Sequence, residues 1–162
     1  MIDDKIVARE DAPRKMQWWK EAGEKVVFTN GCFDLIHAGH VRYLEQAKCL
    51  GDRLVVGVNS DESVRALKGE DRPIQPVTDR ATILAALASV DLVVVFPELT
   101  TEKLLRELRP DVMVKGGDYT LDTVVASERD FVFSYGGEYV IIPTVVRTST
   151  TRIVKRIRSE GN

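Results

Sequence analysis

The sequence is poor in cysteine and lacks a long apolar run, and both absences narrow the class of protein. Its only cysteines are Cys32 and Cys49, too few for a disulfide framework or a cysteine-based metal site. We expect both to be reduced thiols in a cytoplasmic protein. No apolar stretch approaches the roughly 20 residues that a membrane-spanning helix needs. The first residues carry acidic side chains and lack the apolar core of a signal peptide, so we expect no membrane partner.

An excess of positive charge is missing as well. Lysine and arginine number 23 against 25 aspartates and glutamates, which leaves a formal net charge of −2. No overall field therefore draws the chain to nucleic acid or to an acidic membrane, and we expect no nucleic-acid partner. Any phosphate binding must come from a few placed cations and from backbone amides.

The common glycine-rich nucleotide motifs are also absent. No G-x-G-x-x-G follows the first predicted strand, and G-x-x-x-x-G-K-[ST] occurs nowhere in the chain. This argues against a dehydrogenase and against a P-loop ATPase. The length of 162 residues suits one domain. We expect a single domain over residues 1–162, with residues 1–23 forming a helical segment that packs on it.

Short β-branched runs alternate with amphipathic stretches along the chain. We predict strands at residues 25–30, 53–59, 91–96, 111–115 and 138–142. We predict helices over residues 11–22, 41–50, a short segment after Ser60, 78–88, 100–109 and 149–157. Continuous apolar strands are typical of a parallel sheet that helices cover on both faces. The pattern therefore predicts an α/β fold, a doubly wound (Rossmann-like) five-stranded parallel sheet with helices on both faces, whose ligands bind beyond the carboxyl ends of the strands.

Both histidines of the chain fall in one turn directly after the first predicted strand, in the run GCFDLIHAGH at residues 31–40. His37 and His40 are three residues apart and share one face at the start of a helix, where unpaired amides favour phosphate. Gly31 and Gly39 let a ligand approach the backbone closely. The run predicts a phosphate site. A histidine pair without a ligand and a zinc site completed by Asp34 are the alternatives.

The same run resembles the G-x-F-D-x-x-H-x-G-H signature of the cytidylyltransferase-like nucleotidyltransferases. The H-x-G-H turn also resembles that of class I aminoacyl-tRNA synthetases, for which this chain is far too short. The resemblance implies one nucleotidyltransferase domain, in which His37 and His40 contact the nucleotide phosphates and stabilise the transition state. It further implies that the nucleotide is bound by the neighbouring residues Asn30, Gly31, Cys32, Phe33 and Gly39.

A run of hydroxyl side chains opens the last predicted helix. By itself the run TSTT at residues 148–151 is typical of a capped surface helix. It also resembles the second signature of the family, which holds the β- and γ-phosphates, so Ser149, Thr150 and Thr151 are predicted to bind the nucleotide. Arg80, in the helix predicted at 78–88, is predicted to contact the nucleotide phosphates or else to pair with a nearby acid.

From about residue 24 to residue 158, the chain is most similar to the adenylyltransferases that make ADP-heptose from heptose 1-phosphate. The similarity rests on TNGCFDLIHAGHVRYLEQA, VGVNSD, the LKG and DRP of the polar loop, and VKGGDY. Lys115 is predicted to be catalytic through a phosphate contact. The predicted sugar-phosphate-binding residues are Asp34, Lys68, Gly116, Gly117, Asp118 and Tyr119. A solvated loop at Lys68 and a tight surface turn after the fourth strand are the plainer interpretations.

The resemblance implies transfer of AMP from ATP to heptose 1-phosphate, with release of pyrophosphate, for lipopolysaccharide core or a related glycan. Mg²⁺ would be carried by the nucleotide phosphates, and we expect no metal site built from protein side chains. A homodimer is implied, and so is a separate kinase that supplies the heptose phosphate. Two alternatives stay open: a cytidylyltransferase acting on glycerol 3-phosphate or another alcohol phosphate, and a non-catalytic nucleotide-sensing module.

Overall fold

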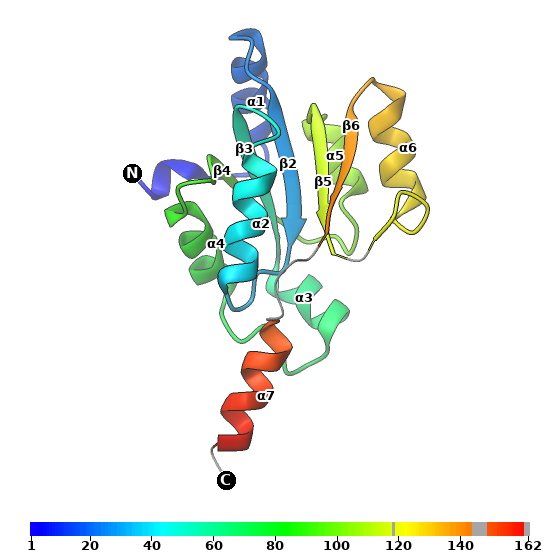
Figure 1. Ribbon diagram of the computed structural model, residues 1–162. Coiled ribbons are helices and arrows are strands. Elements are labelled where there is room, and N and C mark those ends of the chain that lie inside the picture. Colours follow the sequence, from blue (N-terminus) through cyan, green and yellow to red (C-terminus); the bar gives the residue numbers. More distant parts are fainter. Residues whose placement is uncertain (118, 144–148, 161–162) are drawn as a thin grey trace.

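The computed structural model describes residues 1–117, 119–143 and 149–160, with no account of the Glu160 side chain. Figure 1 shows strands alternating with helices along the chain. The elements, in order, are η1 (Asp3–Lys5), β1 (Ile6–Val7), α1 (Ala12–Glu21), β2 (Val26–Gly31), α2 (Ala38–Lys48), β3 (Arg53–Asn59), α3 (Asp61–Lys68), α4 (Val77–Ala86), β4 (Leu92–Phe96), α5 (Glu102–Leu108), β5 (Val112–Gly116), α6 (Ala126–Ser134), β6 (Glu138–Ile142) and α7 (Thr150–Glu160).

The strands form one parallel sheet in the order β1-β4-β3-β2-β5-β6. The five predicted strands are β2 to β6, and the predicted doubly wound architecture is confirmed. The predicted strand count is corrected to six, because β1 adds an edge strand beside β4. With two residues, β1 is too short to leave a periodic signal in the sequence.

Strands β2 to β5 bury side chains on both faces of the sheet, as expected for a parallel sheet that helices cover. In β2, Phe28 joins the core beneath α1, α5 and α6, while Val27 joins the core beneath α2 and α4. Both side chains are fully buried. Burial of a side chain of this size contributes about 1.5–3 kcal/mol, so the two cores hold the helices to the sheet.

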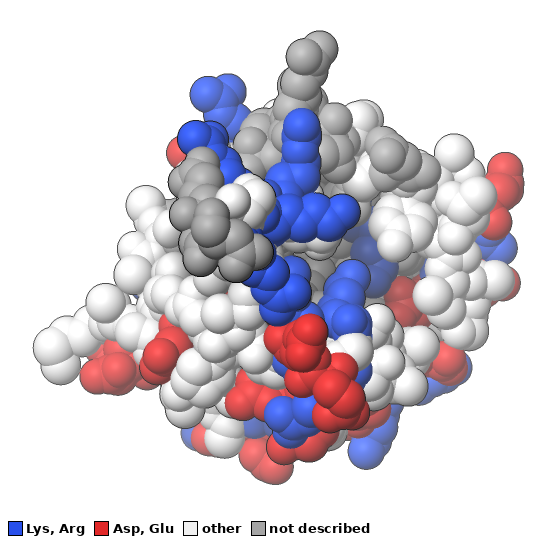
Figure 2. Space-filling view, turned by 90° about the horizontal axis from the view of Figure 1, so that it is seen from below, with Lys and Arg blue, Asp and Glu red and all other residues white. Residues whose placement is uncertain are grey.

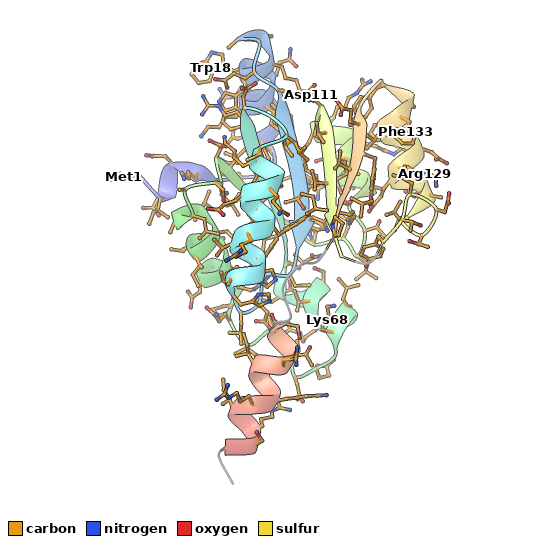
Figure 3. The ribbon with its side chains drawn as sticks, in the orientation of Figure 1. Met1, Trp18, Lys68, Asp111, Arg129 and Phe133 are labelled. Carbon is orange, nitrogen blue, oxygen red and sulfur yellow. The ribbon has the colours of Figure 1, made fainter. Side chains whose placement is uncertain are left out.

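The two adjacent tryptophans of the N-terminal segment differ in burial. Trp19 is buried against the sheet, whereas Trp18 is 69% exposed and points away from the body (Figure 3). Met16, three residues before Trp19, shares its buried face, which follows the helical period.

At the other end of the molecule, α7 extends beyond the sheet (Figure 1). No helix in the described part of the chain combines the length and apolar character needed to cross a bilayer.

Sheet topology determines where a ligand can sit. The chain winds from β2 to β3 and β4 in one direction, then returns to place β5 and β6 on the other side of β2. The reversal lies between β2 and β5, and in doubly wound sheets the crevice at such a reversal binds ligands at the carboxyl ends. Asn30 and Gly31 end β2 there, and Lys115 and Gly116 end β5.

Candidate active site

A cavity of about 800 Å³ opens at the carboxyl ends of β2, β3, β5 and β6. Both predicted motifs reach it. Of the predicted site residues, those that line the cavity are Asn30, Gly31, Cys32, Phe33, Asp34, His37, Gly39, His40, Lys68, Lys115, Gly116, Tyr119, Ser149, Thr150 and Thr151. The topology therefore brings together residues that are more than 100 positions apart in the chain.

Positive charge gathers around this cavity although the chain as a whole is slightly acidic. Among the described residues, the cations in its wall are Arg42, Lys68, Arg72 and Lys115, against one carboxylate, that of Asp34. Figure 2 views this end of the molecule and shows lysine and arginine side chains around the hollow. Such a local field suits a ligand with several phosphate charges.

The histidine turn starts α2. His37 is its N-cap residue, and its Nδ1 accepts a hydrogen bond from the Gly39 backbone N–H at 3.1 Å. In a neutral ring the proton must then sit on Nε2, so His37 can donate from Nε2. The His40 ring stacks on it, with 3.9 Å between ring centroids, and Phe33 contacts His40 edge-on at 5.3 Å.

The protein keeps both imidazoles neutral near pH 7. Burial lowers the pKa of His37. For His40, burial and then the neighbouring His37 lower the pKa to about 4, and a backbone hydrogen bond with Leu35 opposes the shift. The His40 Nδ1 atom is buried and has no hydrogen-bond partner in the described structure. Each neutral ring carries one N–H, that of His37 on Nε2, and neither ring bears the cost of a buried cation.

The second motif is held against the first. Thr150 Oγ1 donates to the Leu35 carbonyl at 3.2 Å, and Ser149 Oγ accepts from the Arg152 backbone N–H at 3.2 Å. The latter bond is an N-cap of α7. The hydroxyl run therefore caps a helix, as its pattern indicated, and Ser149, Thr150 and Thr151 line the cavity.

The carboxylate of Asp34 is already hydrogen-bonded to other groups of the protein. It is 5% exposed, and its carboxylate accepts from Arg72 Nη1 at 2.9 Å and from the backbone N–H groups of Ile74 and Gln75 at 2.8 and 3.1 Å. These bonds hold the loop between α3 and α4 over the first motif. The predicted sugar-phosphate contact of Asp34 would have to compete with them, so the structure favours a loop-closing role.

Arg80 lies beneath the cavity and is not among its lining residues. Its guanidinium is fully buried and donates to the carbonyls of Cys32 at 2.6 Å and Gln75 at 3.0 Å, and to Asp61 at 2.7 Å. The structure does not show the predicted phosphate contact of Arg80. It shows the alternative, a pair with a nearby acid: the bond to Asp61 joins α4 to α3, and the bond to Cys32 joins α4 to the first motif.

Lys115 leaves the end of β5 and donates to Asn30 Oδ1 at 2.8 Å. Gly116 follows it, and a Cβ there would lie 2.6 Å from the Tyr43 ring. The glycine is therefore needed for packing against Tyr43 of α2. Gly117 has a φ of 130° and is not among the lining residues, and Asp118 lies outside the described residues.

Sequence reasoning missed part of the wall. Arg42 and Gln46 line the cavity from α2, and Asn59 does so from the end of β3. Arg42 and Gln46 are four residues apart in the same helix, so a helical projection would have placed these two side chains on the same face as each other. Leu67 and Leu99 also line it, but nothing in their local sequence distinguishes them from core leucines.

Comparisons with known proteins agree with this geometry. Residues 28–156 match the cytidylyltransferase-like family. The chain belongs to that family. This confirms the resemblance drawn from the first motif, and a nucleotidyltransferase is the class of enzyme that the family description supports. The match spans both motifs, which the fold places around one cavity.

Curated relatives extend the likeness. The bifunctional protein HldE of Ectopseudomonas mendocina is 52% identical over 98% of this chain and 32% of its own length. The protein of the same name from Caulobacter vibrioides is 53% identical over 96% of this chain and 32% of its own length. This cytidylyltransferase-like chain thus spans about a third of the length of the curated relatives it matches.

Two solved structures are similar in fold. The lipopolysaccharide core biosynthesis protein of Thermoplasma volcanium is 29% identical, with a TM-score of 0.62 over 78% of this chain and all of that chain. The pantoate-beta-alanine ligase of Francisella tularensis is 16% identical, with a TM-score of 0.59 over 94% of this chain and 76% of that chain. The latter likeness concerns the fold alone.

The depressed pKa of His40 predicts a pH dependence of stability. Because the folded pKa lies near 4 and the unfolded value near 6.5, the unfolded state binds the extra proton between these values. The free energy of unfolding should therefore fall as the pH drops from 6.5 to 4. The part due to His40, reduced for its partial exposure, is on the order of 2 kcal/mol. Urea unfolding of wild type and His40→Asn across this range measures it, and equal pH slopes in both proteins would contradict the assignment.

The buried guanidinium of Arg80 predicts a large loss of stability on its removal. Arg80→Met leaves two carbonyls and the Asp61 carboxylate without their donor, which should lower the free energy of unfolding by about 3 kcal/mol. Arg106→Met is the matched control, because Arg106 forms an exposed i,i+4 pair with Glu102. The control should change stability by less than about 1 kcal/mol. Urea denaturation of both variants decides, and similar values would rule out the structural role.

Proposed function

We propose that this chain transfers AMP from ATP to a heptose 1-phosphate, giving ADP-heptose and pyrophosphate. The observation that carries the proposal is the meeting of the histidine turn and the hydroxyl run in one cavity whose wall is rich in cations. The extended similarity to heptose 1-phosphate adenylyltransferases and the 52% identity to a bifunctional protein HldE support the choice of substrates. The solved relative named for lipopolysaccharide core biosynthesis supports the same choice.

The proposed chemistry is an in-line displacement at phosphorus. An oxygen of the sugar phosphate attacks the α-phosphorus of ATP, the new P–O bond forms, and the bond from the α-phosphorus to the bridging oxygen breaks to release pyrophosphate. The acceptor is already an anion, so no side-chain nucleophile is needed. The protein acts by positioning the two substrates and by stabilising charge on the phosphate oxygens.

The proposal assigns a role to each residue, and the geometry of the cavity supports the assignment. The stacked imidazoles of His37 and His40 donate to the α-phosphate and to the oxygen that bridges to the leaving group. Ser149 and Thr150, held beside Leu35, bind the departing pyrophosphate. Lys115 contacts a phosphate from the opposite wall. Lys68 receives the sugar phosphate. Cys32 is not a nucleophile in this scheme, and burial raises the pKa of its thiol, which keeps it protonated.

Magnesium fits this site when it is carried by the substrate. The described residues contain no group of three or more side chains suited to hold a metal ion. The Asp34 carboxylate in the wall is already occupied by three protein donors. Mg²⁺ bound to the nucleotide phosphates would neutralise their charge there, as the ion prefers few protein ligands in such sites. We place the reaction in the cytoplasm, and a homodimer and a separate heptose kinase remain part of the proposal.

Pyrophosphate release tests the proposed reaction directly. We expect release that requires both ATP and heptose 1-phosphate, and that CTP or GTP does not support. His40→Ala should reduce kcat by about 10²–10³, because it removes one preorganised donor, while Arg106→Met should leave the rate unchanged. Release with CTP and glycerol 3-phosphate would instead establish the cytidylyltransferase alternative. Nucleotide binding without turnover on any acceptor would favour the sensing module.

The two substrate sites should separate by kinetics. Lys68→Met is expected to raise the KM for heptose 1-phosphate at least tenfold and to change the KM for ATP little, because its cation meets the acceptor. Ser149→Ala should mainly affect the KM for ATP. Initial rates with each substrate varied at saturation of the other measure this. A Lys68→Met variant that affects only ATP would reverse the assignment.

A further inference from the structure

A buried carboxylate lies behind Lys115. Glu128, in the first turn of α6, is 1% exposed. Its Oε1 accepts from the backbone N–H of Thr101 at 2.7 Å and from Thr101 Oγ1 at 2.6 Å. These two bonds hold one carboxylate oxygen at the start of α5 and fix the orientation of the whole group.

The second oxygen faces the cavity lysine. Glu128 Oε2 lies 3.6 Å from Lys115 Nζ, is buried, and has no hydrogen-bond partner in the described structure. Lys115 Nζ in turn donates to Asn30 Oδ1 at 2.8 Å. The ammonium therefore lies between an amide on β2 and a carboxylate on α6, which leaves a donor for a ligand in the cavity that Lys115 lines.

The surroundings of this pair make the carboxylate important. The Lys115 side chain is only 20% exposed, and burial lowers the pKa of its ammonium while Glu128 raises it. Tyr139 on β6 interacts electrostatically with Glu128, and also with Tyr43 on α2, Tyr119 and Arg129. Burial raises the pKa of Tyr43 and of Tyr139, so both phenols stay neutral. Glu128 is therefore the counter-charge of Lys115 among these groups.

We propose that Glu128 is a positioning residue that holds the Lys115 ammonium charged and in place at the cavity wall, where it meets a phosphate of the substrates. The part that concerns phosphate rests on the proposed function. The part that concerns Lys115 does not, since it follows from the contacts of Glu128 with Thr101 and Lys115. A buried ammonium without this partner would lose its proton more readily.

The protonation of Lys115 can be measured without substrates. Trace labelling of the free protein with acetic anhydride at a series of pH values, read by mass spectrometry of the Lys115 peptide, gives the apparent pKa of that amine. In Glu128→Gln, which keeps an acceptor for Thr101 but removes the charge, we expect this pKa to fall by about one unit or more. The control is Glu138→Gln, at an exposed ion pair with Lys25 at the opposite end of the sheet. An unchanged pKa in folded Glu128→Gln would overturn the proposal.

A compensating charge sharpens the test. Asn30→Asp in the Glu128→Gln background places a carboxylate on the other side of the same ammonium, at the position now 2.8 Å away. We expect it to restore the apparent pKa of Lys115, which a general loss of packing in Glu128→Gln would not permit. If thermal unfolding shows that Glu128→Gln does not fold, Glu128→Asp replaces it. That variant withdraws the carboxylate by one methylene and should lower the pKa by a smaller amount, and no change would count against the proposal.

Kinetics then test the link to phosphate transfer. The alkaline limb of the kcat profile should move to lower pH in Glu128→Gln by the same amount as the labelling pKa, with a larger effect on kcat than on KM. A labelling shift with an unmoved kinetic profile would overturn the role of the pair in transfer. Failure of the proposed function is seen separately, as absence of pyrophosphate release in the wild-type protein.

Discussion

Strand β2 lies at the centre of the sheet, paired in parallel with β3 on one side and with β5 on the other. Both pairings depend on a strand that is apolar on both faces, with Phe28 in one core and Val27 in the other. Because parallel pairing aligns carboxyl ends, it brings Asn30 and Lys115 within hydrogen-bond distance. The positions of the cavity, of the histidine turn and of Lys115 in the cavity wall all follow from this arrangement.

Three buried charged side chains shape the loops around that cavity. Asp34 holds the loop between α3 and α4, Arg80 ties α3 and α4 to the first motif, and Glu128 holds the start of α5. Each of them bonds backbone atoms of a segment distant in sequence. A buried charge is stable only when it is paired and hydrogen-bonded, so these residues specify loop positions that apolar packing alone would leave open.

The electrostatics of the site are local. The chain has a formal charge of −2, yet its described cavity wall carries four cations against one carboxylate, itself paired with Arg72. Within this wall the two imidazoles stay neutral, because burial lowers the pKa of both and the neighbouring His37 lowers that of His40 further. In the proposed reaction, the neutral imidazoles donate to oxygens at the reacting phosphorus, and the cations around them bind the phosphates of the substrates.

Local pattern in the sequence determined much of the fold and the position of the first motif. Strand β6 runs over the predicted residues 138–142, and β3 over 53–59, since an apolar run between turns is a local signal. The histidine pair stood out because both rings fall in one turn after a strand. The family follows from that run, and residues 28–156 match it.

Tertiary structure alone decided the partners of the buried charges. Arg80 looked like a phosphate ligand in the sequence, but its three partners come from other segments that only the fold assembles. Helix α6 escaped prediction because residues 126–134 lack a clear apolar stripe, and Glu128 escaped with it. Its partners Thr101 and Lys115 are on other elements. A sequence records hydrophobic period and helix capping, which act between neighbours, whereas the pairing of a buried charge depends on long-range packing.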